Sequence, residues 1–264
     1  MFKAAFIGTG NMGSALVMAA CQSIGGEQVV ITNRTLAKAE ALAQEVGCQV
    51  RADNRETARE AEYIFLCVKP HLIRGVMEEI GPLQKGQAVV SVAAGVQLRD
   101  LQTWAGEGVP VLRIMPNTPC AIGKGMTALY AGTCAGETHL AAVEAILAKS
   151  GRVERIDEKL MDAFGAVAGC GPAFIYPYLE ALADGGVTCG LSRQQALTCA
   201  AQMALGAAAM VLETGEHPGK LKDDVCSPGG STIVGVAELE RHGLRAAAID
   251  AVVAACKKSG ELGK

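Results

Sequence analysis

A glycine-rich turn near the first residues constrains the fold more than any other stretch of this sequence. The apolar run 4–7 stops at Gly8, and Gly10 and Gly13 follow at G-x-G-x-x-G spacing before a helical pattern of small residues begins. In a dinucleotide-binding unit the first glycine permits a tight turn, the second lets the backbone approach the pyrophosphate, and the third lets the helix pack on the strand. A second strand pattern, residues 29–32, follows at the distance typical of a βαβ unit. We therefore expect a nucleotide-binding site here; an ordinary strand–helix turn is the alternative.

The composition is that of a globular protein and argues against several other classes. Half of the 264 residues are hydrophobic (50%), and the net charge of -3 comes without a basic run. That charge argues against nucleic acid or an anionic membrane as the main partner. The ten cysteines form no CxxC pair and the histidines do not cluster, so neither a metal site nor a disulfide framework is expected. Without a secretory signal pattern, we expect reduced thiols and a cytoplasmic protein.

One uncharged segment, residues 194–212, is long enough to cross a bilayer. It consists mainly of alanine, with one glycine and several polar residues, so it is only weakly apolar. A tightly packed helix of a soluble protein is the better interpretation.

The end of the second strand pattern indicates which dinucleotide is bound. An NAD-selective site carries an Asp or Glu there, which accepts hydrogen bonds from the ribose 2′-hydroxyl. This chain has Asn33, Arg34 and Thr35 instead, with Lys38 one helical turn later. These residues supply donors and positive charge where a 2′-phosphate would lie. The pattern favours NADPH, with NADH as the alternative cofactor; solvated basic residues at the head of a surface helix are the other interpretation.

Three further apolar strand patterns end in polar or small residues. Ligands of open α/β sheets bind beyond the carboxyl ends of the strands, so Lys69 is expected at the cofactor crevice. Ala93 and Ala94 would let a flat ring approach the backbone. Asn117 and Thr118 either contact the ring or the substrate, or they cap their own turn. The three patterns are residues 63–68, 87–92 and 109–115.

Strand patterns disappear after about Asp157, and long Ala-rich helical patterns take over. We therefore predict an α/β domain of Rossmann type over residues 1–157, with a doubly wound sheet, and an all-α domain over residues 158–264. A helical domain so rich in Ala and Gly is thin alone, so two copies are expected to intertwine as a homodimer.

Loop 227–232, Ser-Pro-Gly-Gly-Ser-Thr, stands out in the helical half. It opens directly into a helical pattern, so several backbone amides converge on one point that suits a carboxylate or a phosphate. A simple helix cap by Ser231 or Thr232 is the alternative.

Several of these motifs, taken together, resemble the pyrroline-5-carboxylate reductase family. The resemblance covers nearly the whole chain, and the Ser-Pro-Gly-Gly-x-Thr loop is its most specific part. The matching stretches are residues 8–13, 68–70, 91–95, 115–119, 168–173 and 223–232.

The resemblance implies an oxidoreductase of the last step of proline synthesis, in which NAD(P)H gives a hydride to L-1-pyrroline-5-carboxylate and yields L-proline. It also implies a Rossmann domain followed by a helical dimerisation domain, with dimers often associating further. Some members have an acidic residue at the substrate site where this chain has Gly215, so Glu213 and Glu216 receive no role. The substrate would be held by Gly229, Gly230, Ser231 and Thr232. The cofactor would be held by Ile7, Gly8, Thr9, Gly10, Asn11, Met12, Arg34, Thr35, Asn54, Val68, Lys69, Pro70, Ala93 and Ala94.

The reaction requires the side chains to orient the substrate and does not require a strong acid or base. The substrate is a cyclic imine with a carboxylate, and the amides of residues 229–232 would bind that carboxylate and fix the ring against the nicotinamide. The Thr232 hydroxyl is the expected catalytic group, hydrogen-bonded to the ring nitrogen, which must be protonated as hydride reaches carbon 5. Because an imine can take its proton from solvent, no strongly tuned acid is expected.

Two other functions are the alternatives. A β-hydroxyacid dehydrogenase has a similar N-terminal turn but a lysine at the start of its interdomain helix, and residues 169–176 contain no lysine. A non-catalytic NADP-binding regulator would bind cofactor without turnover and would leave the anion-binding loop unexplained.

Overall fold

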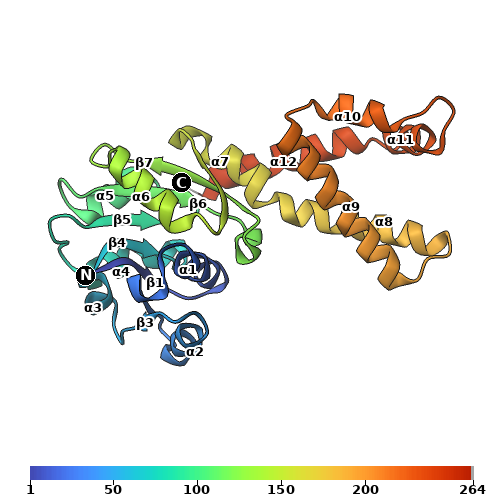
Figure 1. Ribbon diagram of the computed structural model, residues 1–264. Coiled ribbons are helices and arrows are strands. Elements are labelled where there is room, and N and C mark those ends of the chain that lie inside the picture. Colours follow the sequence, from blue (N-terminus) through green and yellow to red (C-terminus); the bar gives the residue numbers. More distant parts are fainter. Residues whose placement is uncertain (263–264) are drawn as a thin grey trace. The chain divides into compact units, whose positions relative to one another are not determined.

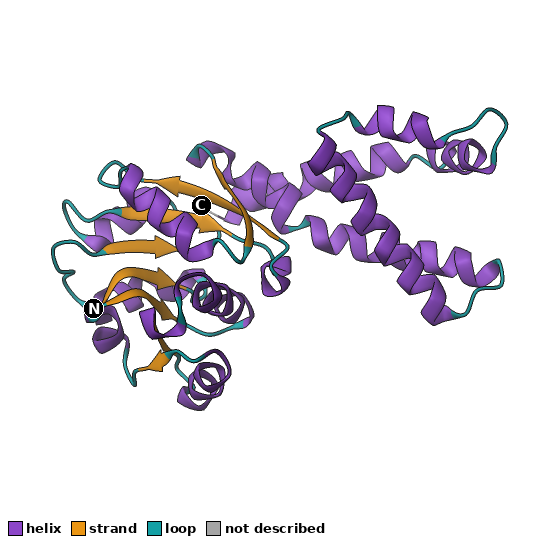
Figure 2. Ribbon diagram, in the orientation of Figure 1, coloured by secondary structure: helices purple, strands orange, loops and turns teal. Residues whose placement is uncertain are grey.

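The computed structural model describes residues 1–262 and contains two compact units. The first unit comprises Met1–Cys170 together with the end of the chain from Ala255, and the second comprises Gly171–Ala254. Figures 1 and 2 show that the strands all belong to the first unit, while the second is helical. The predicted α/β half followed by an all-α half is therefore confirmed.

The first unit is built on an eight-stranded sheet with the order β3-β2-β1-β4-β5-β6-β7-β8. Strands β3 to β6 run parallel, β7 is antiparallel to β6, and β8 is parallel to β7. This is the predicted doubly wound sheet of Rossmann type. The strands are β1 (Phe2–Ile7), β2 (Val29–Thr32), β3 (Gln49–Val50), β4 (Ala61–Leu66), β5 (Ala88–Ser91), β6 (Val111–Met115), β7 (Gly125–Ala131) and β8 (Gly151–Arg155).

The two faces of this sheet bury separate apolar clusters, because successive strand residues point to opposite faces. Phe6 and Phe65 lie on one face and stack with ring centroids 4.5 Å apart. Ile64, Leu66 and Leu101 lie in the cluster on the other face. Each such side chain contributes about 1.5–3 kcal/mol when fully buried. The helices of this unit are α1 (Asn11–Ile24), η1 (Gly26–Gln28), α2 (Leu36–Val46), α3 (Asn54–Arg59), η2 (Pro70–Leu72), α4 (Ile73–Ile80), α5 (Leu98–Ala105), η3 (Thr118–Ile122), α6 (Glu137–Leu147), η4 (Glu158–Leu160), α7 (Met161–Phe164) and the π-helical turn η5 (Gly165–Gly169).

The first unit continues beyond the predicted domain boundary at Asp157. Arg113 on β6 forms an ion pair with Glu158 at 2.5 Å, and the Glu158 carboxylate also accepts a hydrogen bond from the Leu98 N–H at 2.8 Å. Met161 and Ala166 are buried. These contacts attach residues 158–170 to the sheet, so the compact units divide after Cys170 rather than after Asp157.

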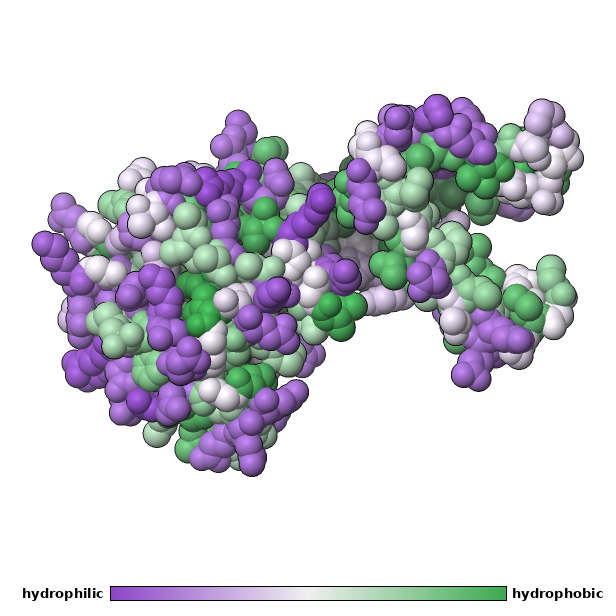
Figure 3. Space-filling model, in the orientation of Figure 1, coloured by the Kyte–Doolittle hydropathy of each residue, from purple (hydrophilic) through white to green (hydrophobic). Residues whose placement is uncertain are grey.

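The second unit consists of five helices with little apolar burial. The buried hydrophobic residues recorded in its described part are three alanines, Ala183, Ala196 and Ala200. Among the described helices, α9 is long and apolar enough to cross a membrane by length and composition. Figure 3 shows apolar residues on the surface of this unit. Its helices are α8 (Gly171–Thr188), α9 (Arg193–Thr214), α10 (Pro218–Val225), α11 (Ser231–Arg241) and α12 (Leu244–Leu262), whose last turns belong to the first unit.

Candidate functional site

The glycine-rich turn between β1 and α1 has the geometry that the sequence predicts. Gly8 has a φ of +100°, and a Cβ there would lie 2.8 Å from the Cys67 carbonyl oxygen. A Cβ on Gly13 would lie 2.2 Å from the Gly8 carbonyl oxygen. Gly10, the N-cap of α1, has no atom within 4 Å of a Cβ and no side-chain cap. The first amides of α1 therefore face open space, which suits an anion.

Thr9 gives this turn an unsatisfied polar group. Its hydroxyl oxygen is buried. Among the described residues, it is the one buried side-chain nitrogen or oxygen that lacks a hydrogen-bond partner. The Thr9 N–H donates to Asn33 Oδ1 at 3.2 Å, and Asn33 Nδ2 donates to the Thr35 carbonyl at 3.1 Å. Asn33 thus ties the end of β2 to the turn. Leaving a buried hydroxyl unpaired costs about 1–3 kcal/mol, which a bound polar ligand would offset.

A cavity of about 810 Å³ opens beside the turn, and predicted cofactor residues line much of it. Arg34 and Lys69 contribute positive charge, and in the described part of the chain neither lies within ion-pair distance of a carboxylate. Asn54, which also lines the cavity, donates to Glu79 Oε2 at 2.7 Å. Free positive charge together with open helix amides fits a phosphorylated ligand. The predicted residues in this lining are Ile7, Gly8, Gly10, Arg34, Asn54, Val68 and Lys69.

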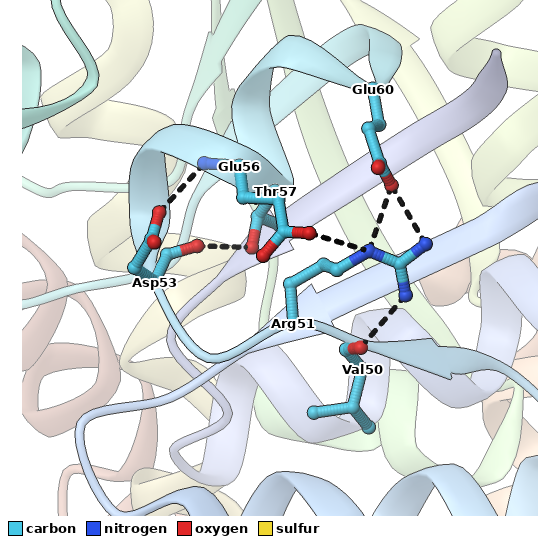
Figure 4. Close-up of polar contacts among 6 residues, drawn as sticks. All are labelled: Val50, Arg51, Asp53, Glu56, Thr57 and Glu60. Carbon is cyan, nitrogen blue, oxygen red and sulfur yellow. Dashed lines mark hydrogen bonds and ion pairs between the residues drawn. The ribbon is translucent and has the colours of Figure 1, made fainter.

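A polar network joins the residues on either side of α3, as Figure 4 shows. Asp53 caps α3 by accepting a hydrogen bond from the Glu56 N–H at 2.7 Å. Arg51, just before it, donates from Nε to Glu60 Oε2 at 2.9 Å. Asp53 thus caps the first turn of α3, Arg51 bonds to the residue that follows the helix, and Asn54, the first residue of α3, lines the cavity.

A smaller cavity of about 360 Å³ adjoins the first, since Cys67 and Val68 line both. Burial raises the pKa of the Cys67 thiol to about 12, so it is neutral at physiological pH. Ser259 of α12 is among the few polar residues of a largely apolar lining that would accept a flat ring. The other lining residues are Met12, Val92, Ala94, Met115, Pro116, Gly165, Ala166, Gly169, Cys170 and Ala255.

The remaining predicted cofactor residues lie around these cavities without lining them. Asn11 is exposed as the first residue of α1, and Thr35 is the N-cap of α2. Pro70 opens η2, and Ala93 is buried just after β5. Among the described residues, no group of three or more His, Cys, Asp or Glu side chains is placed to hold a metal ion.

Several lining residues were not foreseen from the sequence. Gly165, Ala166, Ala255 and Ser259 come from helical stretches, and an Ala-rich pattern does not indicate which face of a helix meets the sheet. Asn117 makes contacts that neither predicted role includes. Its side chain bonds to the Ala168 carbonyl and to the Met126 N–H, so it joins two backbone segments.

Loop 227–232 of the second unit forms a tight turn at the start of α11. Gly229 has a φ of +68°, and the Gly230 N–H donates to the Ser227 carbonyl at 3.0 Å. Gly230 is the N-cap and provides no side-chain cap, whereas Ser231 and Thr232 are the first helical residues. The alternative that Ser231 or Thr232 caps the helix is therefore wrong. Both residues are exposed, and the first amides of α11 are available to an anion.

Comparison with known proteins relates both units to characterised families. A family model described as pyrroline-5-carboxylate reductase dimerisation matches residues 158–262, and one described as NADP oxidoreductase coenzyme F420-dependent matches residues 3–95. Pyrroline-5-carboxylate reductase of Pisum sativum is 41% identical over 259 residues, which are 97% of this chain and 94% of the relative.

Solved structures agree with these matches. A pyrroline-5-carboxylate reductase from Coxiella burnetii has a TM-score of 0.93 at 33% identity and covers 100% of this chain and 99% of its own. The pyrroline carboxylate reductase of Plasmodium falciparum, solved with NADP bound, has a TM-score of 0.88 at 31% identity, with 100% and 98% covered.

Proposed function

The chain belongs to the pyrroline-5-carboxylate reductase family and reduces L-1-pyrroline-5-carboxylate to L-proline with NAD(P)H, and we propose how its residues divide that work. The first unit holds the dinucleotide, and loop 227–232 holds the substrate. The observation that carries this division is that each unit offers open helix amides at a glycine turn, one beside a dinucleotide-sized cavity and one on a short loop. One turn suits a pyrophosphate, and the other suits a small carboxylate.

The cofactor is held in two cavities beyond the carboxyl ends of the strands. The amides after Gly10 and the Thr9 hydroxyl bind the pyrophosphate, and Arg34 pairs with the 2′-phosphate, which makes NADPH the preferred cofactor. The smaller apolar cavity receives the nicotinamide ring, which supplies the hydride when bound. Asn11, Thr35, Pro70 and Ala93 act from the rim of these cavities.

The substrate carboxylate is bound by the amides that open α11, with Gly229 and Gly230 allowing the close approach of the backbone. Thr232 donates or accepts one hydrogen bond at the ring nitrogen and so orients carbon 5. We expect the ring nitrogen to obtain its proton from solvent.

The protein acts as a homodimer in the cytoplasm, and its dimers can associate further. Support for the dimer comes from the exposed apolar residues of α9 and from the match of residues 158–262 to a dimerisation model. The same apolar face would be covered by a second copy rather than by lipid, because alanine dominates α9.

Thr232→Ala tests the assignment of the substrate loop. We expect kcat to fall about 10- to 100-fold, which corresponds to one hydrogen bond to a charged group. NADPH affinity, measured by nicotinamide fluorescence, should stay within about threefold, because Thr232 lies outside the cofactor cavities. A large loss of NADPH binding would show that the loop serves the cofactor and would overturn the assignment.

A further inference from the structure

The helical turn η5, which borders the smaller cavity, has π-helical rather than α-helical geometry. In η5 the Cys170 N–H donates to the Gly165 carbonyl, five residues back, at 2.8 Å. Such π-helical turns are rare and occur frequently at functional sites. The turn is followed at once by α8, so nearly every carbonyl in this stretch depends on a helical N–H for its partner.

The Ala168 carbonyl is an exception, because its α-helical donor does not exist. That donor would be the N–H of residue 172, and Pro172 has none. The Asn117 side chain replaces it: Asn117 Nδ2 donates to the Ala168 carbonyl oxygen at 2.9 Å.

The other end of the same amide is also engaged. Asn117 Oδ1 accepts a hydrogen bond from the Met126 N–H of β7 at 2.9 Å. The residue is 8% exposed and follows β6 by two positions. Because an amide combines a donor and an acceptor, an Asp or a Leu at this position would keep at most one of the two bonds.

These bonds connect Asn117 to the wall of the nicotinamide cavity. Gly165, Ala166 and Gly169 line that cavity from η5, and Met115 and Pro116 line it from the end of β6. The packing between the two sides is tight, since a Cβ on Gly165 would lie 2.6 Å from Met115 Sδ. A shift of η5 would therefore change the shape of the space offered to the ring.

We propose that Asn117 is a positioning residue for hydride transfer, which holds η5 against the end of β6 through the carbonyl that Pro172 leaves without a helical donor. The inference rests on the proposed function, since it assumes that the ring occupies the smaller cavity. Asn117 itself is not among the residues that line either cavity. Its amide fixes the wall of the cavity that receives the ring.

The test is the pair of variants Asn117→Ala and Asn117→Ala/Pro172→Ala, with Pro172→Ala and Gln102→Ala as controls. Gln102 bonds to Thr133 at 3.2 Å outside the site, so its variant removes a comparable amide elsewhere. Asn117→Ala should lower kcat by about tenfold or more and raise the primary isotope effect from C4-deuterated NADPH, because misplacement of reacting groups is costly. The NADPH Kd should change less than about threefold, since the larger cavity is untouched.

Restoring a backbone N–H at position 172 should reverse part of this loss. In the double variant we expect kcat to recover at least about threefold, because the Ala168 carbonyl regains a donor. Hydrogen exchange of the cofactor-free protein gives an independent readout. Exchange should accelerate at residues 165–170 and at Met126 in Asn117→Ala, and the double variant should restore protection at residues 165–170 but not at Met126.

Unchanged kcat and isotope effect in a folded Asn117→Ala, or a double variant without recovery, would overturn the proposal. Absence of turnover in the unsubstituted protein would instead overturn the proposed function. Should Asn117→Ala not fold, Asn117→Asp carries the test, because it keeps the acceptor for Met126 and loses only the donor. Its kcat should be low at neutral pH and rise as pH falls and the acid regains an O–H; a flat profile would contradict the proposal.

Discussion

The two units of this protein differ in how they use their apolar residues. In the first, large side chains such as Phe6 and Leu66 are fully buried on the two faces of the sheet. In the second, Met203 and Leu205 of α9 are 51% and 55% exposed in the single chain. The difference indicates that the first unit completes its own core, whereas the second leaves large apolar side chains exposed in the single chain, as the proposed dimer requires.

The surfaces that we propose for ligand binding also differ between the two units. The first lines its cavities with side chains and backbone from several strand ends, which suits a large cofactor. The second offers one loop of backbone amides, which suits a small carboxylate. Under the proposed function, specificity for the cofactor would therefore depend on side chains such as Arg34, and substrate binding would depend on the conformation of loop 227–232.

Of the variants considered, Leu205→Glu should have the largest effect. If it left dimerisation unchanged, the contrast between the two units would be wrong. A charge placed on the exposed apolar face of α9 should weaken dimerisation at least about 100-fold, because it would be desolvated in the dimer. Sedimentation over a range of concentrations measures the dimer constant. Ile122→Glu, at an exposed apolar residue of the first unit, is the matched control and should leave it unchanged.

Two glycine variants separate folding from binding within the first unit. Gly13→Ala should lower the free energy of unfolding by about 1–3 kcal/mol, since its Cβ would overlap the Gly8 carbonyl. Gly10→Ala should unfold as the unsubstituted protein does but bind NADPH about tenfold more weakly or worse, since its Cβ would occupy the space in front of the α1 amides. Thermal unfolding and NADPH titration measure both, and a destabilised Gly10→Ala would contradict the assignment of open space.

Arg34→Ala sharpens the claim that side chains of the first unit select the cofactor. Loss of a charge-assisted bond to the 2′-phosphate should raise the NADPH Kd about 10- to 30-fold and leave the NADH Kd within about twofold. Fluorescence titration with each cofactor measures the two constants. Arg152→Ala, at an exposed position on β8, is the control; equal losses for NADPH and NADH would refute the 2′-phosphate contact.

Glu144→Gln should have the smallest effect, because it removes an exposed pair at the edge of the sheet. Hydrogen bonding from Arg155 lowers the pKa of Glu144 below its ordinary value of 4.5. A carboxyl with a lowered native pKa stabilises the fold above its ordinary pKa and loses that contribution as pH falls. The variant should lower Tm by at most about 2 °C at neutral pH, with a difference that shrinks below about pH 4.5. A difference in Tm that grew as pH fell would contradict the lowered pKa of Glu144.

Local features of the site could be predicted from the sequence, and long-range ones could not. The roles of Gly8 and Gly13 follow from the spacing of glycines in one turn, and the structure has the positive φ at Gly8 and the close approach at Gly13 that these roles require. The turn at loop 227–232 was local in the same way. The pairing of Arg113 with Glu158, which attaches residues beyond Asp157 to the sheet, was not local, because the two residues lie 45 positions apart.

Asn117 illustrates why long-range contacts of the site could not be predicted from the sequence. Its motif indicated a turn with a polar side chain, but its partner Ala168 lies 51 positions later and offers only a carbonyl. The pattern of side chains in a sequence does not indicate which backbone carbonyl a distant side chain will bind. The sequence did contain one sign of it, Pro172, whose missing N–H requires another donor for that carbonyl.

The most direct test of the account follows the hydride itself. The purified protein is incubated with L-1-pyrroline-5-carboxylate and C4-deuterated NADPH or NADH, and the product is analysed by mass spectrometry. The account predicts proline that carries one deuterium at carbon 5, formed faster with NADPH than with NADH at equal concentrations. Measurable NADPH binding without deuterated proline would contradict it and would favour a cofactor-binding regulator.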